Sequence, residues 1–122
     1  LLKTVELHHT GKGFCGIEGN PYPHKEHRRN AQDAVALVKE KIAASRYDLM
    51  ILDEINNAQA LKLVDLDQVK EILELRPAGM HMVLTGRNAH PDIIEKANTV
   101  SEVMEIKHAY REGIEPQPGV DY

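Results

Sequence analysis

Two adjacent carboxylates, Asp53 and Glu54, directly follow the apolar run Leu-Met-Ile-Leu at residues 49–52. Four apolar residues without alternation are typical of a strand that is covered on both faces, as in a parallel sheet. Such a strand would hold the first carboxylate at the edge of the sheet, where it could order a water bound to Mg²⁺ while its neighbour polarises a reacting group. Acidic residues are also common at strand ends, so the pair alone leaves a purely structural role open.

A carboxylate pair of this kind usually works with a Gly-rich phosphate loop, the Walker A loop, which ends in Gly-Lys-Ser or Gly-Lys-Thr. No such loop occurs within the 122 residues. The stretch Gly11-Lys12-Gly13 lacks a Ser or Thr after its lysine, and no helix is expected directly after it. The sequence therefore predicts one half of a phosphate-handling site.

A second candidate cluster is Thr85-Gly86-Arg87, which follows an expected strand at residues 82–84. A hydroxyl, a flexible residue and a fixed cation are suited to a polyphosphate. The alternative is an ordinary strand-to-helix turn whose arginine is solvated. Because ligands bind at the carboxyl ends of the strands in parallel sheets, we expect this triplet and Asp53 to lie at the same edge.

Histidines near the start of the chain offer a weaker signal. His24 and His27 are spaced for one face of a helix, but Pro21 and Pro23 argue against a helix there. Solvated loop histidines are therefore the favoured interpretation, rather than metal ligands.

Composition and length limit the classes of protein to which the chain could belong. The chain is long enough for one domain, and a net charge of -4 at pH 7 gives no electrostatic case for nucleic acid or an anionic membrane. No apolar run has the length of a membrane span, and no signal peptide opens the chain. Cys15 is the only cysteine, which excludes an internal disulfide and fits a reducing compartment. These features predict a soluble, cytoplasmic protein.

The pattern along the chain predicts an α/β fold with a mostly parallel sheet flanked by helices. The expected strands are residues 4–7, 49–52, 82–84 and 99–106. The expected helices begin at the N-cap Asn30, after a capping box formed by Asp65 and Gln68, and at Pro91. Residues 10–30 are expected to form a long loop of the active-site type, and residues 107–122 an irregular tail.

Three stretches, in this order, resemble the P-loop ATP:corrinoid (cob(I)alamin) adenosyltransferases of the CobA/BtuR type. They are residues 47–56; residues 76–77 and 83–87 with 97–102; and residues 107–110 with 113–114, Gln117 and 119–122. The spacing is continuous from about residue 30 to the last residue. The resemblance implies the C-terminal part of a RecA-like P-loop NTPase fold, in which residues 1–122 form a single partial domain.

The resemblance also implies a reaction and its site. The reaction is transfer of the 5′-deoxyadenosyl group of ATP to the cobalt of a reduced corrinoid, with release of triphosphate. ATP, Mg²⁺ and cob(I)alamin or a related corrinoid would take part. The implied residues are Asp53 and Glu54 for Mg²⁺ and catalysis, Thr85, Gly86, Arg87, Lys107 and His108 for the nucleotide, and Gly13 and Phe14 for the corrinoid.

Several features depart from the family pattern. The family usually has a Trp where this chain has Gly16, and its members begin with a strand and the Walker A loop before the point where this chain starts. We therefore expect a homo-oligomer, a partly rearranged fold, or association with a missing N-terminal segment. The alternatives to an enzyme are a fragment that binds a corrinoid or a partner without group transfer, and a truncated product with no function.

Overall fold

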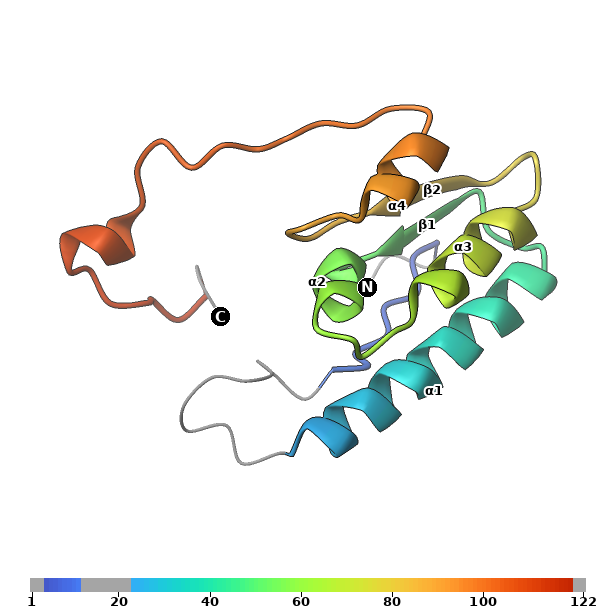
Figure 1. The fold of residues 1–122 in the computed structure, drawn as a ribbon, viewed down its shortest axis with the longest axis horizontal. Coiled ribbons are helices and arrows are strands. Elements are labelled where there is room, and N and C mark those ends of the chain that lie inside the picture. Colours follow the sequence, from blue (N-terminus) through green and yellow to red (C-terminus); the bar gives the residue numbers. More distant parts are fainter. Residues whose placement is uncertain (1–3, 12–22, 120–122) are drawn as a thin grey trace.

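The structure is a computed structural model that describes residues 4–11 and 23–119. Its described residues form a parallel two-stranded sheet of β1 (Leu49–Leu52) and β2 (His81–Leu84), paired in register from Leu49 opposite His81 to Leu52 opposite Leu84. The helices are α1 (His24–Ala43), α2 (Ile55–Ala60), α3 (Leu66–Leu75) and α4 (Pro91–Lys96), with a short 3-10 helix η1 (Ala109–Glu112). Figure 1 shows α3 beside α1, with the strands beyond them. The predicted α/β class with a parallel sheet is confirmed.

The core lies between α1, α3 and one face of the sheet. Val69 and Ile72 of α3 are fully buried there. The other members of the cluster are Val35, Ile42, Leu52, Val64, Met80 and Ile93. All are aliphatic or Met, so apolar burial without aromatic packing stabilises this part of the chain.

The start of α3 was readable from the sequence. The Asp65 carboxylate accepts from the Gln68 backbone N–H, and the Asp65 N–H donates to Gln68 Oε1 over 3.0 Å, which completes the predicted capping box. The helix ends at Leu75, before Pro77, because proline cannot continue the backbone ladder.

Helix α1 begins at His24 rather than after Asn30, so the predicted boundary and the loop reading of residues 24–30 were wrong. Pro23 occupies the N-cap with extended backbone, a position where its fixed φ and missing N–H cost nothing. The early turns are held by distant residues. His24 Nε2 donates to the Leu61 carbonyl over 3.2 Å, and Arg28 pairs with the Asp65 carboxylate over 3.2 Å.

Two predicted strands are absent from the described residues. At residues 4–7 the chain is irregular, and the side chain of Leu7 is 75% exposed. Residues 99–106 form no ladder, and Val103 is 95% exposed. Figure 1 shows this segment leading away from the body. A strand requires a neighbouring strand for its backbone groups, and neither segment has one among the described residues.

The sheet is covered on one face only by the described residues, which corrects the expectation for β1. Leu52 is buried, whereas Leu49 and Ile51 are 52% and 59% exposed. Val83 on β2 is also exposed. No helix in the described ranges is long and apolar enough to cross a membrane.

Candidate functional site

The paired strands deliver Asp53 and Thr85 to the same edge of the sheet. Leu52 and Leu84 are the last register pair, so the residue after each strand leaves the sheet beside the other. The Thr85 hydroxyl donates to Asp53 Oδ1 over 2.6 Å, and the Thr85 N–H donates to the Leu52 carbonyl over 3.2 Å. The structure therefore brings together the two clusters that the sequence placed at one edge.

Glu54 is the N-cap of α2 and has a left-handed backbone, with φ of 60°. This conformation is uncommon for a residue other than glycine and carries strain. The Glu54 N–H donates to Thr85 Oγ1 over 3.0 Å, so the same hydroxyl that holds Asp53 also supports the strained residue. The two consecutive carboxylates are in this way fixed to the turn after β2.

The turn after β2 is tied to the first turn of α2. The Asn56 N–H donates to the Thr85 carbonyl over 3.2 Å, and the Arg87 N–H donates to Asn57 Oδ1 over 2.5 Å. Gly86 has φ of +120°, and a Cβ there would lie 2.4 Å from Asn57 Oδ1. Only glycine fits this position, because both the backbone angle and the space exclude a side chain.

Asn57 is a site residue that the sequence reasoning missed. In the sequence, Asn57 stands four residues after Asp53, in an Asn-Asn pair. This position does not indicate that its side chain contacts the turn after β2. The contact joins residues 30 positions apart, so it depends on the sheet register.

The charges at this edge suit a metal-bound polyphosphate. Asp53, Glu54 and Arg87 are all exposed, and the Arg87 guanidinium makes no hydrogen bond or ion pair with any described residue. Carboxylate and hydroxyl oxygens are the donors that Mg²⁺ prefers. Within the described ranges no group of three or more His, Cys, Asp or Glu could hold a metal.

Lys107 and His108 are not brought to this edge. Lys107 Nζ pairs with Glu112 Oε1 over 3.1 Å, and His108 Nδ1 accepts from the Tyr110 N–H over 3.1 Å as the cap of η1. These contacts are all local, and Figure 1 shows η1 apart from the sheet. Gly13 and Phe14 lie outside the described residues.

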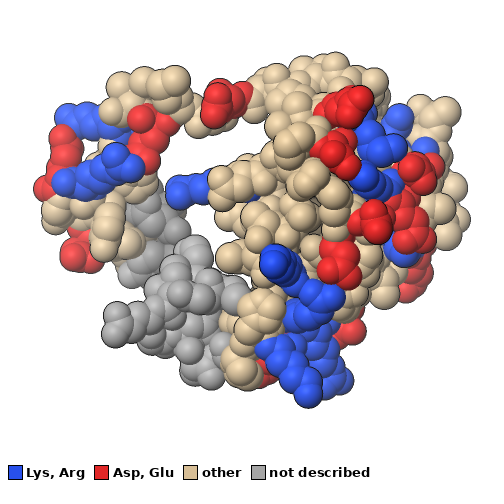
Figure 2. Space-filling model, viewed as in Figure 1, with Lys and Arg blue, Asp and Glu red and all other residues tan. Residues whose placement is uncertain are grey.

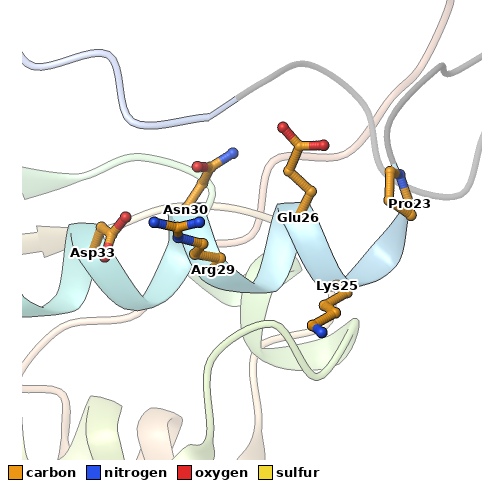
Figure 3. A pocket seen from close by; sticks show the side chains of 6 residues that line it. All are labelled: Pro23, Lys25, Glu26, Arg29, Asn30 and Asp33. Atoms are coloured by element: carbon orange, nitrogen blue, oxygen red, sulfur yellow. The ribbon is translucent and has the colours of Figure 1, made fainter.

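Neither of two open surface hollows coincides with the edge. One lies along the first half of α1, where Figure 3 shows the side chains of Pro23, Lys25, Glu26, Arg29, Asn30 and Asp33. The other is crossed by an ion pair between Lys70 and Asp92. On the face drawn in Figure 2, acidic and basic side chains are interspersed over much of the body, with basic side chains gathered in one strip. This distribution gives no broad basic surface on that face.

Comparison with known proteins identifies the family to which the chain is similar. The family model described as ATP:corrinoid adenosyltransferase BtuR/CobO/CobP matches residues 1–122. A corrinoid adenosyltransferase of Pseudomonas aeruginosa is 36% identical over 121 residues, which cover 97% of this chain and 57% of that protein. One of Sinorhizobium sp. is 43% identical over 93 residues, covering 75% and 44%. One of Escherichia coli K12 is 39% identical over 84 residues, covering 69% and 43%.

The chain thus spans about half the length of the curated relatives it matches. The match of the family model over the whole chain agrees with the resemblance read from residues 47–56 and 83–87. The chain belongs to the ATP:corrinoid adenosyltransferase family BtuR/CobO/CobP.

Proposed function

We propose that the protein of which this chain forms part transfers the 5′-deoxyadenosyl group of ATP to the cobalt of a reduced corrinoid. In this reaction the cobalt(I) substrate supplies the electron pair for the new bond to C5′, and the C5′–O bond breaks so that triphosphate leaves with its electrons. The protein's task is then to orient two substrates and to stabilise the departing anion. The observation that carries the proposal is the hydrogen bond between Thr85 and Asp53, because it unites the carboxylates with the turn that bears Arg87.

Each residue of the edge takes a role that fits its chemistry. Asp53 and Glu54 would bind Mg²⁺, which neutralises phosphate charge when it is bound. The Arg87 guanidinium would contact phosphate oxygens, for which its planar fork of donors is suited. Gly86 lets the backbone approach closely, and Thr85 orients Asp53. These assignments rest on donor type and on the shared edge.

The remaining assignments depend on the family resemblance. Lys107 and His108 would join the nucleotide site only if the segment that carries them approaches the sheet, since both have local partners here. Gly13 and Phe14 would face the corrinoid. The proposed setting is the cytoplasm, whose reducing conditions suit a cobalt(I) substrate.

The test is formation of adenosylcobalamin by the protein that contains this chain. The purified protein is mixed with ATP, Mg²⁺ and chemically reduced cob(I)alamin, and the product is followed by its visible spectrum. Asp53→Asn and Arg87→Gln should each reduce the rate by about tenfold or more, the scale of a lost charge-assisted hydrogen bond. Arg29→Gln removes the same charge from the exposed side of α1 and should leave the rate unchanged. Equal losses in both arginine variants would contradict the proposed site.

A second candidate function is binding without transfer. The observation that favours it is the lack of a Walker A sequence within the 122 residues, since that loop supplies most of the phosphate contacts in this kind of site. In that case the chain binds cob(II)alamin or a protein partner but forms no adenosylcobalamin. The same assay separates the two functions, with corrinoid binding followed by equilibrium dialysis.

The exposed apolar face of the sheet supports association. Leu49, Ile51 and Val83 lie on it, and the described residues leave all three exposed. Either a second copy or a segment outside this chain would cover such a face. Sedimentation velocity tests this: a sharp monomer with high cooperative thermal stability would contradict it.

A further inference from the structure

We propose that Asn57 is a positioning residue, whose side-chain amide holds the backbone turn that presents Arg87 at the carboxylate edge. The inference rests on the proposed function, because it concerns the contact between Arg87 and a phosphate ligand. Two structural observations support the inference. Asn57 Oδ1 accepts the Arg87 N–H over 2.5 Å, and the same oxygen occupies the space where a side chain at residue 86 would begin.

The turn needs such a support because the sheet ends before it. Thr85 is still held by backbone contacts, through its N–H to Leu52 and its carbonyl to Asn56. Arg87 follows Gly86, whose φ of +120° turns the chain away from the strand direction. Among the described residues, the N–H of Arg87 has Asn57 Oδ1 as its hydrogen-bond acceptor, and Arg87 makes no other hydrogen bond or ion pair.

Helix α2 links the position of Arg87 to that of the carboxylates Asp53 and Glu54. The helix begins at its N-cap Glu54, directly after Asp53, and Asn57 stands in its first turn. A short helical turn has fixed backbone geometry, so the backbone of Asn57 lies at a fixed place relative to that of Glu54. The side chain of Asn57 carries the oxygen that accepts from Arg87. Binding the Arg87 N–H to that oxygen places the backbone of the cation relative to the proposed magnesium ligands. A displacement of about 1 Å in such a pair can strongly reduce its effect on a bound phosphate.

A neutral acceptor suits this position. A carboxylate at residue 57 would accept the same hydrogen bond but would add a third negative charge near Asp53 and Glu54, where a phosphate is proposed to bind. An apolar side chain would leave the Arg87 N–H without its acceptor. Asparagine has an acceptor of the right length and no charge.

The first part of the test measures the turn itself. Amide hydrogen exchange is followed by NMR in the wild-type chain and in Asn57→Ala, Asn57→Asp and Gln59→Ala. Exchange of the Arg87 amide should become about tenfold faster in Asn57→Ala, the scale of one lost hydrogen bond, and should be nearly unchanged in Asn57→Asp. Gln59→Ala, the matched control, removes an amide from the same helix without touching the turn. Unchanged exchange in Asn57→Ala overturns the inference.

The second part measures the consequence for a ligand. Binding of inorganic triphosphate with Mg²⁺ is measured by calorimetry for Asn57→Ala, Arg87→Gln and the double variant. If Asn57 acts through Arg87, each single variant binds about tenfold more weakly, and the double variant is no weaker than Arg87→Gln alone. Additive losses overturn the positioning role, because Asn57 would then act independently of the arginine.

The two parts keep the failures distinct. If the wild-type chain binds no triphosphate, the ligand half of this inference fails, whereas the proposed function of the whole protein is decided by the adenosylation assay. If triphosphate binds but Asn57→Ala leaves the Arg87 amide protected, the proposed function stands and the role of Asn57 is wrong. Asn57→Asp guards against misfolding of the alanine variant, since it retains the acceptor.

Discussion

The hydroxyl group of Thr85 donates a hydrogen bond to Oδ1 of Asp53 over 2.6 Å. The contact joins the first residue after β1 to the first residue after β2, so it exists only when the strands pair in their observed register. A slip by one residue would turn the side chains of the shifted strand to the opposite face of the sheet and so separate Thr85 from Asp53. The candidate site therefore forms only when the two strands pair in this register.

Replacing Thr85 tests how much this contact stabilises the fold. Thr85→Val has nearly the same shape but lacks the hydroxyl, so it loses the bond to Asp53 and the acceptor for the strained Glu54 N–H. We expect the free energy of unfolding to fall by about 1–2 kcal/mol, as measured by urea denaturation. Thr85→Ser keeps the hydroxyl and should lose less. Equal stability of the two variants would contradict the importance of the contact.

Gly86 is predicted to tolerate no side chain. In Gly86→Ala the new Cβ meets Asn57 Oδ1 at 2.4 Å and the backbone keeps a φ of +120°. We expect a loss of about 2–3 kcal/mol in the free energy of unfolding. Gly79→Ala is the matched control, because nothing lies within 4 Å of its Cβ, and it should be neutral within about 0.5 kcal/mol. In an Asn57→Ala background the cost of Gly86→Ala should shrink but persist, since the strained φ remains.

The sequence predicted those elements whose signals are local. The capping box of Asp65 and Gln68 begins α3, and Pro91 is the first residue of α4, as expected. Both signals act through contacts within one helical turn, so no knowledge of the rest of the fold is needed.

The sequence did not predict the features that depend on residues distant in the chain. The N-terminal turns of α1 are held by residues 61–68, which no local pattern reveals. Residues 99–106 have the β-branched and apolar content of a strand, yet they lack a neighbouring strand among the described residues. For the candidate site, parallel topology was enough to place Asp53 near Thr85. The contact of Asn57 with Arg87 was out of reach, because it depends on a turn whose geometry follows from Gly86.

Glu6 gives a pH dependence with a defined sign. Hydrogen bonds from Lys41, Tyr47 and His8 lower the pKa of its carboxyl from 4.5 to about 2. Because the folded pKa lies below the unfolded value, the docking of residues 4–11 is fully supported above about pH 4.5 and is lost as the pH falls through about 2. An NMR titration of Glu6 should show the low pKa in wild type.

Lys41→Met provides the comparison for Glu6, because it removes the main hydrogen-bond donor while keeping the length of the side chain. The pKa of Glu6 should rise toward 4.5 in this variant. A normal pKa in the wild-type protein would show that residues 4–11 are not docked on the end of α1 in solution.

Lys70 and Asp92 join α3 to α4 through an ion pair of 2.5 Å. The Lys70 ammonium lowers the pKa of Asp92 below 3.8, and Asp92 raises the pKa of Lys70 above 10.5. The attraction is therefore complete between these two unfolded pKa values. It is lost at low pH as Asp92 is protonated, and at high pH as Lys70 loses its proton.

In Lys70→Met the pKa of Asp92 should rise toward 3.8, as followed by NMR. Both side chains are partly exposed, so 1 M salt should reduce the wild-type shift. Lys96→Met removes a longer contact, to Glu74 at 3.3 Å, and should change the pKa of Asp92 less. An Asp92 pKa that is the same in wild type and Lys70→Met would show that this ion pair does not hold α4 against α3.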